Sequence, residues 1–191
     1  MEQVIIRQHY PGAIAWFTGL SGAGKTTLCL AASEQLRKQG IAVEMLDGDE
    51  MRRTVCAGLG FSREDREENV RRIAAVAEEL ATKGVLVLVA AIAPYRTMRQ
   101  AVRERTSRFV EVYVNASLET CIERDTKGLY KRALAREIES FTGVSDPYEP
   151  PLTPEIECKT EFDSVEVSVA VLVAALGQIL QLEEGPVHAH R

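Results

Sequence analysis

The 191-residue sequence has few cysteines, few aromatic residues, no surplus of positive charge and no long hydrophobic run. Its four cysteines are widely separated and form no CxxC pair, which excludes a zinc ribbon and a disulfide framework. The net charge of −5 argues against a dedicated nucleic-acid-binding protein, because such proteins usually carry a basic surplus. The longest apolar run, Val85–Ala93, is far too short to cross a bilayer.

These absences predict a cytoplasmic protein that binds neither a nucleic acid polymer nor a membrane. Met1–Tyr10 contains charged residues and lacks the apolar core of a secretory signal peptide. Hydrophobic content of 46% and charged content of 27% are ordinary for a globular protein. A chain of this length usually forms one domain, so we expect a single domain over 1–191, with a folded core at about 12–182 and a flexible tail at 183–191.

Apolar runs alternate along the chain with segments of helical periodicity. The expected strands are Ala13–Thr18, Ile41–Leu46, Val85–Ala91, Phe109–Val114 and Glu155–Thr160. The expected helices are Lys25–Gln39, Arg63–Lys83, Ser117–Glu123 and Val165–Leu182. Such alternation predicts an α/β fold with a parallel sheet and right-handed crossovers. The segment from Gly128 to Pro154 contains glycines and prolines and is predicted to be too irregular for a core element.

The stretch "GLSGAGKT" at 19–26 fits the pattern GxxxxGK[ST] and lies between the first expected strand and the first expected helix. Its glycines allow backbone N–H groups to turn inward around a phosphate, and the following helix adds the positive end of its dipole. Lys25 can reach the β- and γ-phosphates, and the Thr26 hydroxyl can ligate Mg²⁺. The residues expected to bind ATP here are Gly19, Leu20, Ser21, Gly22, Ala23, Gly24, Lys25, Thr26 and Thr27.

Acidic residues follow the second expected strand, in "LDGDEMR". A GTPase would need a guanine-reading aspartate, but the nearest candidate, "TKGL" at 126–129, has Leu129 in that place. Asp47 and Asp49 suit a small-molecule kinase, in which one carboxylate holds the metal and the other takes the proton of the acceptor hydroxyl. The alternative is a turn whose aspartates only cap the next helix. The adjacent phosphate loop favours the catalytic interpretation.

Cationic side chains follow these acids. Arg52 lies three residues after Asp49, and Arg66 and Asn69 share one face near the start of the long expected helix. A guanidinium fork suits phosphate or sulfate oxygens, which indicates an anionic acceptor. The alternative is a solvated helix with Arg–Glu pairs, and spacing alone does not decide between the two for Arg66. Phe61 is either a hydrophobic staple or a ring that stacks on a base.

Together with "GLGFSREDREENVRRI", "APYR", "FVEVYVNASLETCIERDTKGLY" and "EIESFTGVSDPYEPP", these motifs resemble the adenylyl-sulfate kinase family, from about Gly12 to Val173. That family transfers the γ-phosphoryl of ATP to the 3′-hydroxyl of adenosine 5′-phosphosulfate, forming 3′-phosphoadenylyl sulfate in sulfate assimilation. The resemblance implies a P-loop NTPase fold of the nucleotide-kinase type: three layers, a central five-stranded parallel sheet and a lid at about 127–151. It also implies Mg²⁺ with ATP, a homodimer, and an ATP sulfurylase as a candidate partner.

The resemblance assigns roles to individual residues. The expected catalytic residues are Lys25, Asp47 and Asp49: Asp49 orients and deprotonates the 3′-hydroxyl, and Asp47 supports Mg²⁺ together with Thr26. Arg124 is expected to stack against the adenine of ATP. The residues expected to contact the acceptor are Asp49, Arg52, Phe61, Arg66, Asn69, Ile92, Lys127, Gly128, Leu129 and Phe141. Phe61 and Phe141 are expected to sandwich its adenine.

One position departs from the family pattern. Family members commonly read Ile-Ser-Pro-Tyr-Arg after the third strand, whereas this chain reads "IAPYR", with Ala93 in place of the serine assigned to a phosphoserine intermediate. A methyl group cannot carry a phosphoryl group, so we expect direct in-line transfer from ATP. Two alternatives stay open: a non-catalytic nucleotide-binding partner of a sulfurylase, and a kinase for another small acceptor.

Overall fold

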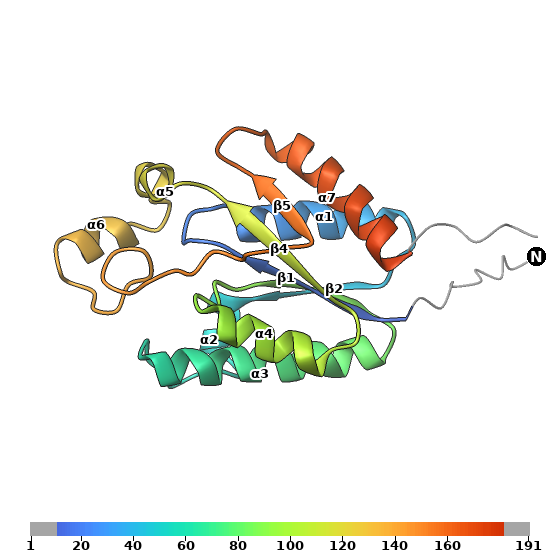
Figure 1. Ribbon diagram of the computed structural model, residues 1–191, viewed down its shortest axis with the longest axis horizontal. Helices are drawn as coiled ribbons and strands as arrows, with labels where there is room; N and C mark the ends of the chain where they lie inside the picture. Colours follow the sequence, from blue (N-terminus) through green and yellow to red (C-terminus); the bar gives the residue numbers. More distant parts are fainter. Residues whose placement is uncertain (1–10, 182–191) are drawn as a thin grey trace, which may run out of the picture.

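The computed structural model describes residues 11–181, and the expected tail at 183–191 lies outside them (Figure 1). The strands are β1 (Ala13–Thr18), β2 (Val43–Asp47), β3 (Leu86–Ala90), β4 (Phe109–Asn115) and β5 (Ile156–Lys159). The helices are α1 (Lys25–Lys38), α2 (Gly48–Arg53), α3 (Arg63–Thr82), α4 (Arg96–Arg105), α5 (Leu118–Arg124), α6 (Leu129–Leu134) and α7 (Val165–Leu180). None of the helices in this part of the chain has the length and apolar character needed to span a membrane.

The strands form one parallel sheet in the order β2-β3-β1-β4-β5. The prediction of a five-stranded parallel sheet is therefore confirmed. Because the strands are parallel, their carboxyl ends meet at one edge, where open α/β sheets bind ligands. Strand β1 is central, and the loop that follows it opens at this edge. In Figure 1 helices α5 and α6 lie beyond the same edge, away from the ends of the described chain.

Helices cover both faces of the sheet, with α1 and α7 on one side and α3 and α4 on the other (Figure 1). The side chains of β1 alternate between two apolar clusters: Phe17 belongs to the cluster with α1 and α7, and Trp16 to the cluster with α3 and α4. Both side chains are fully buried, and each such burial contributes about 1.5–3 kcal/mol. The Trp16 indole N–H donates to the carbonyl of Ala91 at 3.1 Å, which satisfies its polar atom within the core.

Three helices were absent from the sequence prediction. Helix α2 has only six residues, and α4 follows a proline and carries mostly charged and polar side chains, so neither has a long apolar period. Helix α6 lies inside 128–154, and the prediction that this segment holds no core element is wrong at Tyr130. That side chain is 1% exposed, and its hydroxyl donates to the Ser21 carbonyl at 3.0 Å. Tertiary packing against the phosphate loop therefore orders a segment whose composition suggests a loop.

Candidate active site

The loop between β1 and α1 has the backbone that a phosphate cradle needs. Gly22 and Gly24 have φ values of 76° and 103°, in the left-handed region that glycine enters without steric cost. Gly24 occupies the N-cap position of α1 without a capping side chain, so the first N–H groups of the helix have no side-chain acceptor there. This arrangement makes an anion site at a helix N-terminus.

Lys25 folds back over this loop. Its ammonium group donates to the carbonyls of Gly19 at 2.9 Å and Leu20 at 2.7 Å. Burial lowers the pKa of Lys25 from 10.5 to about 8, because the charged form loses hydration and its hydrogen bonds go to neutral carbonyls, while the charge of Asp49 opposes the shift only in part. A triphosphate would supply the opposite charge that this lysine lacks.

Asp47 has two separate roles, one for each carboxylate oxygen. Oδ1 accepts from the backbone N–H of Asp49 at 2.9 Å, which caps α2. Oδ2 accepts from the Thr26 hydroxyl at 2.8 Å, at the end of the phosphate loop. The capping and catalytic interpretations of the sequence are thus compatible, because one oxygen stays directed at the loop.

The Thr26 hydroxyl and the Asp47 carboxylate form an all-oxygen donor pair, the ligand type that Mg²⁺ prefers. Within residues 11–181 no cluster of three or more His, Cys, Asp or Glu side chains could hold a metal by itself. Mg²⁺ in nucleotide sites usually takes one or two protein oxygens and completes its shell with water and phosphate. The residues present therefore fit a nucleotide-bound Mg²⁺.

Asp49 points away from the cap and forms an ion pair with Lys127. The two side chains are 59% and 54% exposed, so the pair faces solvent at the carboxyl edge of the sheet. Lys127 begins the segment 127–151, which we call the lid segment. The structure therefore brings together a carboxylate and a cation that the resemblance both assigned to the acceptor site.

Phe61, which precedes α3, lies beneath two guanidinium groups. The Arg52 carbon Cζ is 4.4 Å from the centre of the Phe61 ring, and that of Arg66 is 5.6 Å away. The ring is 51% exposed, which argues against a buried hydrophobic staple. Arg52 also donates to the Gly60 carbonyl at 3.0 Å, and burial together with the charge of Arg66 lowers its pKa. An aromatic ring and two cations thus form one surface next to the carboxylates.

Arg66 is 6% exposed, so the alternative of a solvated helix is excluded at this position. Burial lowers the pKa of Arg66, while the carboxylate of Asp146 opposes that change; Asp146 Oδ2 is 3.6 Å from Arg66 Nε. The guanidinium donates to the carbonyl of Phe61 at 2.9 Å and to that of Ser140. Arg66 therefore joins the segment that carries Phe61 to the one that carries Phe141.

The solvated interpretation does hold for two arginines further along α3. Arg71 and Arg72 both pair with Glu68, at 2.7 Å and 2.6 Å.

Asn69, on the same face as Arg66, is buried, and its Oδ1 has no hydrogen-bond partner. An unpartnered buried acceptor is costly, and the role of Asn69 toward the acceptor nucleotide stays a prediction.

The remaining predicted acceptor residues lie around the same edge. The Ile92 carbonyl accepts from the Thr18 hydroxyl at 2.6 Å. Phe141 packs edge-on against Tyr130, with ring centroids 5.1 Å apart. Gly128, with φ 65°, occupies the N-cap of α6, and Leu129 is the first residue of that helix. The adenine sandwich by Phe61 and Phe141 stays a prediction.

Arg124 lies behind the phosphate loop. Its guanidinium donates to the carbonyls of Gly22 at 3.4 Å and Thr160 at 2.5 Å. The Thr160 hydroxyl in turn donates to the Ala23 carbonyl at 2.7 Å. Arg124 therefore braces the loop, and its stacking on the adenine of ATP stays a prediction.

Sequence reasoning missed several residues of this site. The Tyr95 hydroxyl donates to Asp146 Oδ1 at 2.9 Å, and the hydroxyls of Tyr148 and Thr18 are 3.0 Å apart. Asp146 and Tyr148 line a hollow of about 510 Å³ between Leu20 and the lid segment. The signal was present in the quoted motif "SDPYE", but nothing local in it indicates which distant side chains it meets.

The site combines three features: a phosphate loop after the central strand, a Thr–Asp pair that could ligate a metal ion, and a carboxylate that faces a lysine. Together with the fold, they define a small-molecule kinase of the P-loop type. The adenylylsulphate kinase family model matches residues 11–159 of this chain. The chain therefore belongs to the adenylylsulphate kinase family.

Individual relatives agree with this assignment. The chain is 55% identical over 168 residues to an adenylyl-sulfate kinase of Rippkaea orientalis, covering 88% of this chain and 93% of the relative. It is similar to the structure of the Mycobacterium tuberculosis APS kinase in complex with AMPPNP and APS, with 39% identity and a TM-score of 0.85. The match covers 87% of this chain and 98% of that one. A hexameric APS kinase from Thiobacillus denitrificans matches with 34% identity and a TM-score of 0.67, covering 89% of this chain and 29% of that one.

Proposed function

We propose that this protein transfers the γ-phosphoryl of ATP to the 3′-hydroxyl of adenosine 5′-phosphosulfate, forming 3′-phosphoadenylyl sulfate for sulfate assimilation. The observation that carries this proposal is the surface made by the exposed Phe61 ring and Arg52, backed by the buried Arg66, with Asp49 near enough for its charge to act on Arg52. Such a surface suits an acceptor with an aromatic base and an anionic phosphosulfate. The complex of the Mycobacterium tuberculosis relative with AMPPNP and APS supports the same pair of ligands.

ATP would bind with its β- and γ-phosphates against the N–H groups of the loop and the ammonium of Lys25. Lys25 would exchange its bonds to the Gly19 and Leu20 carbonyls for bonds to phosphate oxygens. Thr26 and Asp47 would hold Mg²⁺, which when bound neutralises negative charge on the phosphates. The chain's own cations then keep the terminal phosphoryl in line with the acceptor.

Asp49 would orient the 3′-hydroxyl and accept its proton. The hydroxyl oxygen attacks the γ-phosphorus, the bond from that phosphorus to the bridging oxygen of ADP breaks, and the proton goes to the Asp49 carboxylate. We infer that this transfer is direct, because Ala93 offers no nucleophile for a phosphorylated intermediate.

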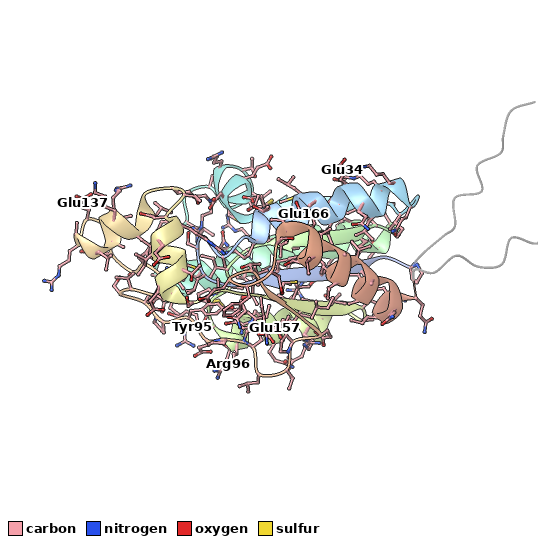
Figure 2. The ribbon with its side chains drawn as sticks, turned by 90° about the horizontal axis from the view of Figure 1, so that it is seen from above. Glu34, Tyr95, Arg96, Glu137, Glu157 and Glu166 are labelled. Carbon is pink, nitrogen blue, oxygen red and sulfur yellow. The ribbon has the colours of Figure 1, made fainter. Side chains whose placement is uncertain are left out.

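The lid segment would close over the two substrates. It already contacts the site through Lys127 and through the Arg66 bond to Ser140. Closure excludes water, which would otherwise compete with the acceptor for the phosphoryl group. In Figure 2 Glu137 marks the outer end of this segment, away from the sheet.

The test compares acceptors with the purified protein. ADP release should depend on adenylyl sulfate, and AMP, gluconate and shikimate should give a kcat/KM lower by about 100-fold or more. Mass spectrometry with ³¹P NMR should locate the new phosphate on the 3′-oxygen. A higher kcat/KM for another acceptor would identify a different kinase. Absence of turnover with all four would favour a non-catalytic partner of a sulfurylase.

We further propose a cytoplasmic homodimer, with an ATP sulfurylase as a candidate partner. All four cysteines are buried free thiols, which agrees with a reducing compartment. Light scattering of the purified protein should give twice the mass of 21.1 kDa. A monomer mass at assay concentrations would contradict the dimer.

A further inference from the structure

Arg99 lies on α4, outside every motif that the sequence analysis singled out. Its side chain is 2% exposed, and its guanidinium contacts three separate segments. Nε donates to Glu111 Oε1 on β4 at 2.5 Å, Nη1 to the Ala93 carbonyl at 2.6 Å, and Nη2 to the Glu149 carbonyl at 2.7 Å. One buried cation thus ties the sheet to the loop after β3 and to the end of the lid segment.

The first of these loops carries part of the expected acceptor pocket. Ala93 has a φ of 43°, in the left-handed region that residues with a Cβ seldom adopt, so surrounding contacts must hold it there. The Arg99 bond to its carbonyl is such a contact. Ile92, one residue earlier, is expected to line the acceptor pocket, so its position depends on the same backbone.

The second loop is the returning end of the lid segment. The Glu149 N–H donates to the Pro94 carbonyl at 2.8 Å, and the Glu149 carboxylate accepts from the Arg96 N–H at 2.8 Å. Arg99 Cζ is also 5.9 Å from the centre of the Tyr148 ring, whose hydroxyl meets Thr18 at the start of the phosphate loop. In Figure 2 Arg96 lies close to this returning segment.

We propose that Arg99 is a positioning residue for the acceptor pocket. It holds the Ile92–Ala93 backbone and the Tyr148–Glu149 end of the lid segment in fixed register with the phosphate loop, so that only the outer lid moves on closure. This inference rests on the proposed function, because the pocket is that of the sulfated nucleotide. Glu111 balances the charge, while the two carbonyl bonds use the fixed geometry of the guanidinium fork.

The kinetic test uses two variants. Arg99→Lys keeps the positive charge but lacks the guanidinium fork. The double variant Arg99→Met/Glu111→Gln removes the cation and replaces the Glu111 carboxylate, which would otherwise be left unpaired. Arg103→Met is the matched control: Arg103 lies one turn later on α4, is 30% exposed, pairs with Glu155 at 2.6 Å and approaches the other Glu111 oxygen at 3.5 Å, but its hydrogen bonds go to Glu155 and not to the two loops. Both Arg99 variants should raise the KM for adenylyl sulfate about tenfold or more and lower kcat, with the KM for ATP within about twofold. Arg103→Met should stay within about twofold of the parent protein on all constants.

Hydrogen exchange gives a second readout that needs no acceptor. In both Arg99 variants the amide of Glu149 should exchange about tenfold faster or more, measured well below the melting temperature, and in Arg103→Met it should not. Unchanged exchange at Glu149, or KM values for ATP and adenylyl sulfate that rise equally, would overturn the inference. If the parent protein itself does not use adenylyl sulfate, the proposed function fails, whereas exchange at Glu149 still decides whether Arg99 holds this loop.

Discussion

Lys127 forms an ion pair with Asp49, although 78 residues separate them in the sequence. A cation of the lid segment therefore covers the carboxylate that we propose as the proton acceptor. Both side chains are more than half exposed, and exposed ion pairs contribute only about 0–1 kcal/mol. The acceptor hydroxyl can thus displace Lys127 from Asp49 at little cost and leave the lysine free to approach the phosphates.

Removing the proposed base should abolish most turnover without weakening ATP binding. Asp49→Asn should lower kcat by about 10²–10⁴-fold, because the amide cannot accept the proton of the 3′-hydroxyl. The Kd for ATP, measured by calorimetry, should change little, since Asp47 and not Asp49 faces Thr26. Glu50→Gln is the matched control, because Glu50 is an exposed acid on the same short helix. Normal turnover by Asp49→Asn would remove Asp49 from the mechanism.

ATP binding should take up protons near pH 8. Burial lowers the pKa of Lys25 to about 8, and triphosphate binding favours its charged form. At pH 8 about half of the free protein carries neutral Lys25, so binding should take up about half a proton per ATP. Below about pH 7 the uptake should vanish, and above pH 8 the affinity should fall by up to about tenfold per pH unit.

The same shift affects stability. Between pH 8 and 10.5 the unfolded chain binds more protons at Lys25 than the folded chain, so this lysine makes the nucleotide-free protein more stable as the pH rises through that window.

Calorimetry of ATP binding in two buffers of different ionisation enthalpy measures the proton uptake that accompanies binding. Lys131→Met, which changes an exposed lysine on α6, should leave it unaltered. No uptake at pH 8 would contradict the role given to Lys25.

The Phe61 ring should act on the acceptor only. Stacking on a base contributes about 1–3 kcal/mol, so Phe61→Ala should raise the KM for adenylyl sulfate by roughly 5- to 150-fold, with the KM for ATP unchanged. Phe162→Ala is the control, because Phe162 is 80% exposed and follows β5. Equal KM values for adenylyl sulfate in Phe61→Ala and the parent protein would show that the ring does not stack on the acceptor.

Phosphoryl transfer should leave no label on the protein. Acid quenching after mixing with γ-³²P-ATP alone should yield no stable phosphoprotein, because Ala93 has no hydroxyl. Ala93→Ser should keep kcat within about threefold, since direct transfer makes no use of that side chain. Stoichiometric labelling of the unaltered protein would refute direct transfer. Asp49→Asn, treated identically, shows whether any trace of label depends on turnover.

Most of the fold was predictable because its signals are local. The apolar runs of β1, β3 and β4 and the helical spacing of α1, α3 and α7 lie within single segments, and their observed bounds differ from prediction by only a few residues. Helix α4 is absent from the prediction because it is short and largely charged, and α6 because it is short and the burial of Tyr130 against distant segments helps to order it. Arg99 could not be predicted, since its partners lie on three segments that the fold brings together.

The sequence by itself determined the loop that we propose as the triphosphate site, because glycine spacing, a lysine and a helix start within eight residues specify its geometry locally. Only the tertiary structure decided that Asp47 both caps α2 and meets Thr26, that Arg66 is buried, and that Lys127 covers Asp49. These outcomes depend on contacts between segments far apart in the chain, whose geometry is set by packing on a shared sheet and not by any local preference.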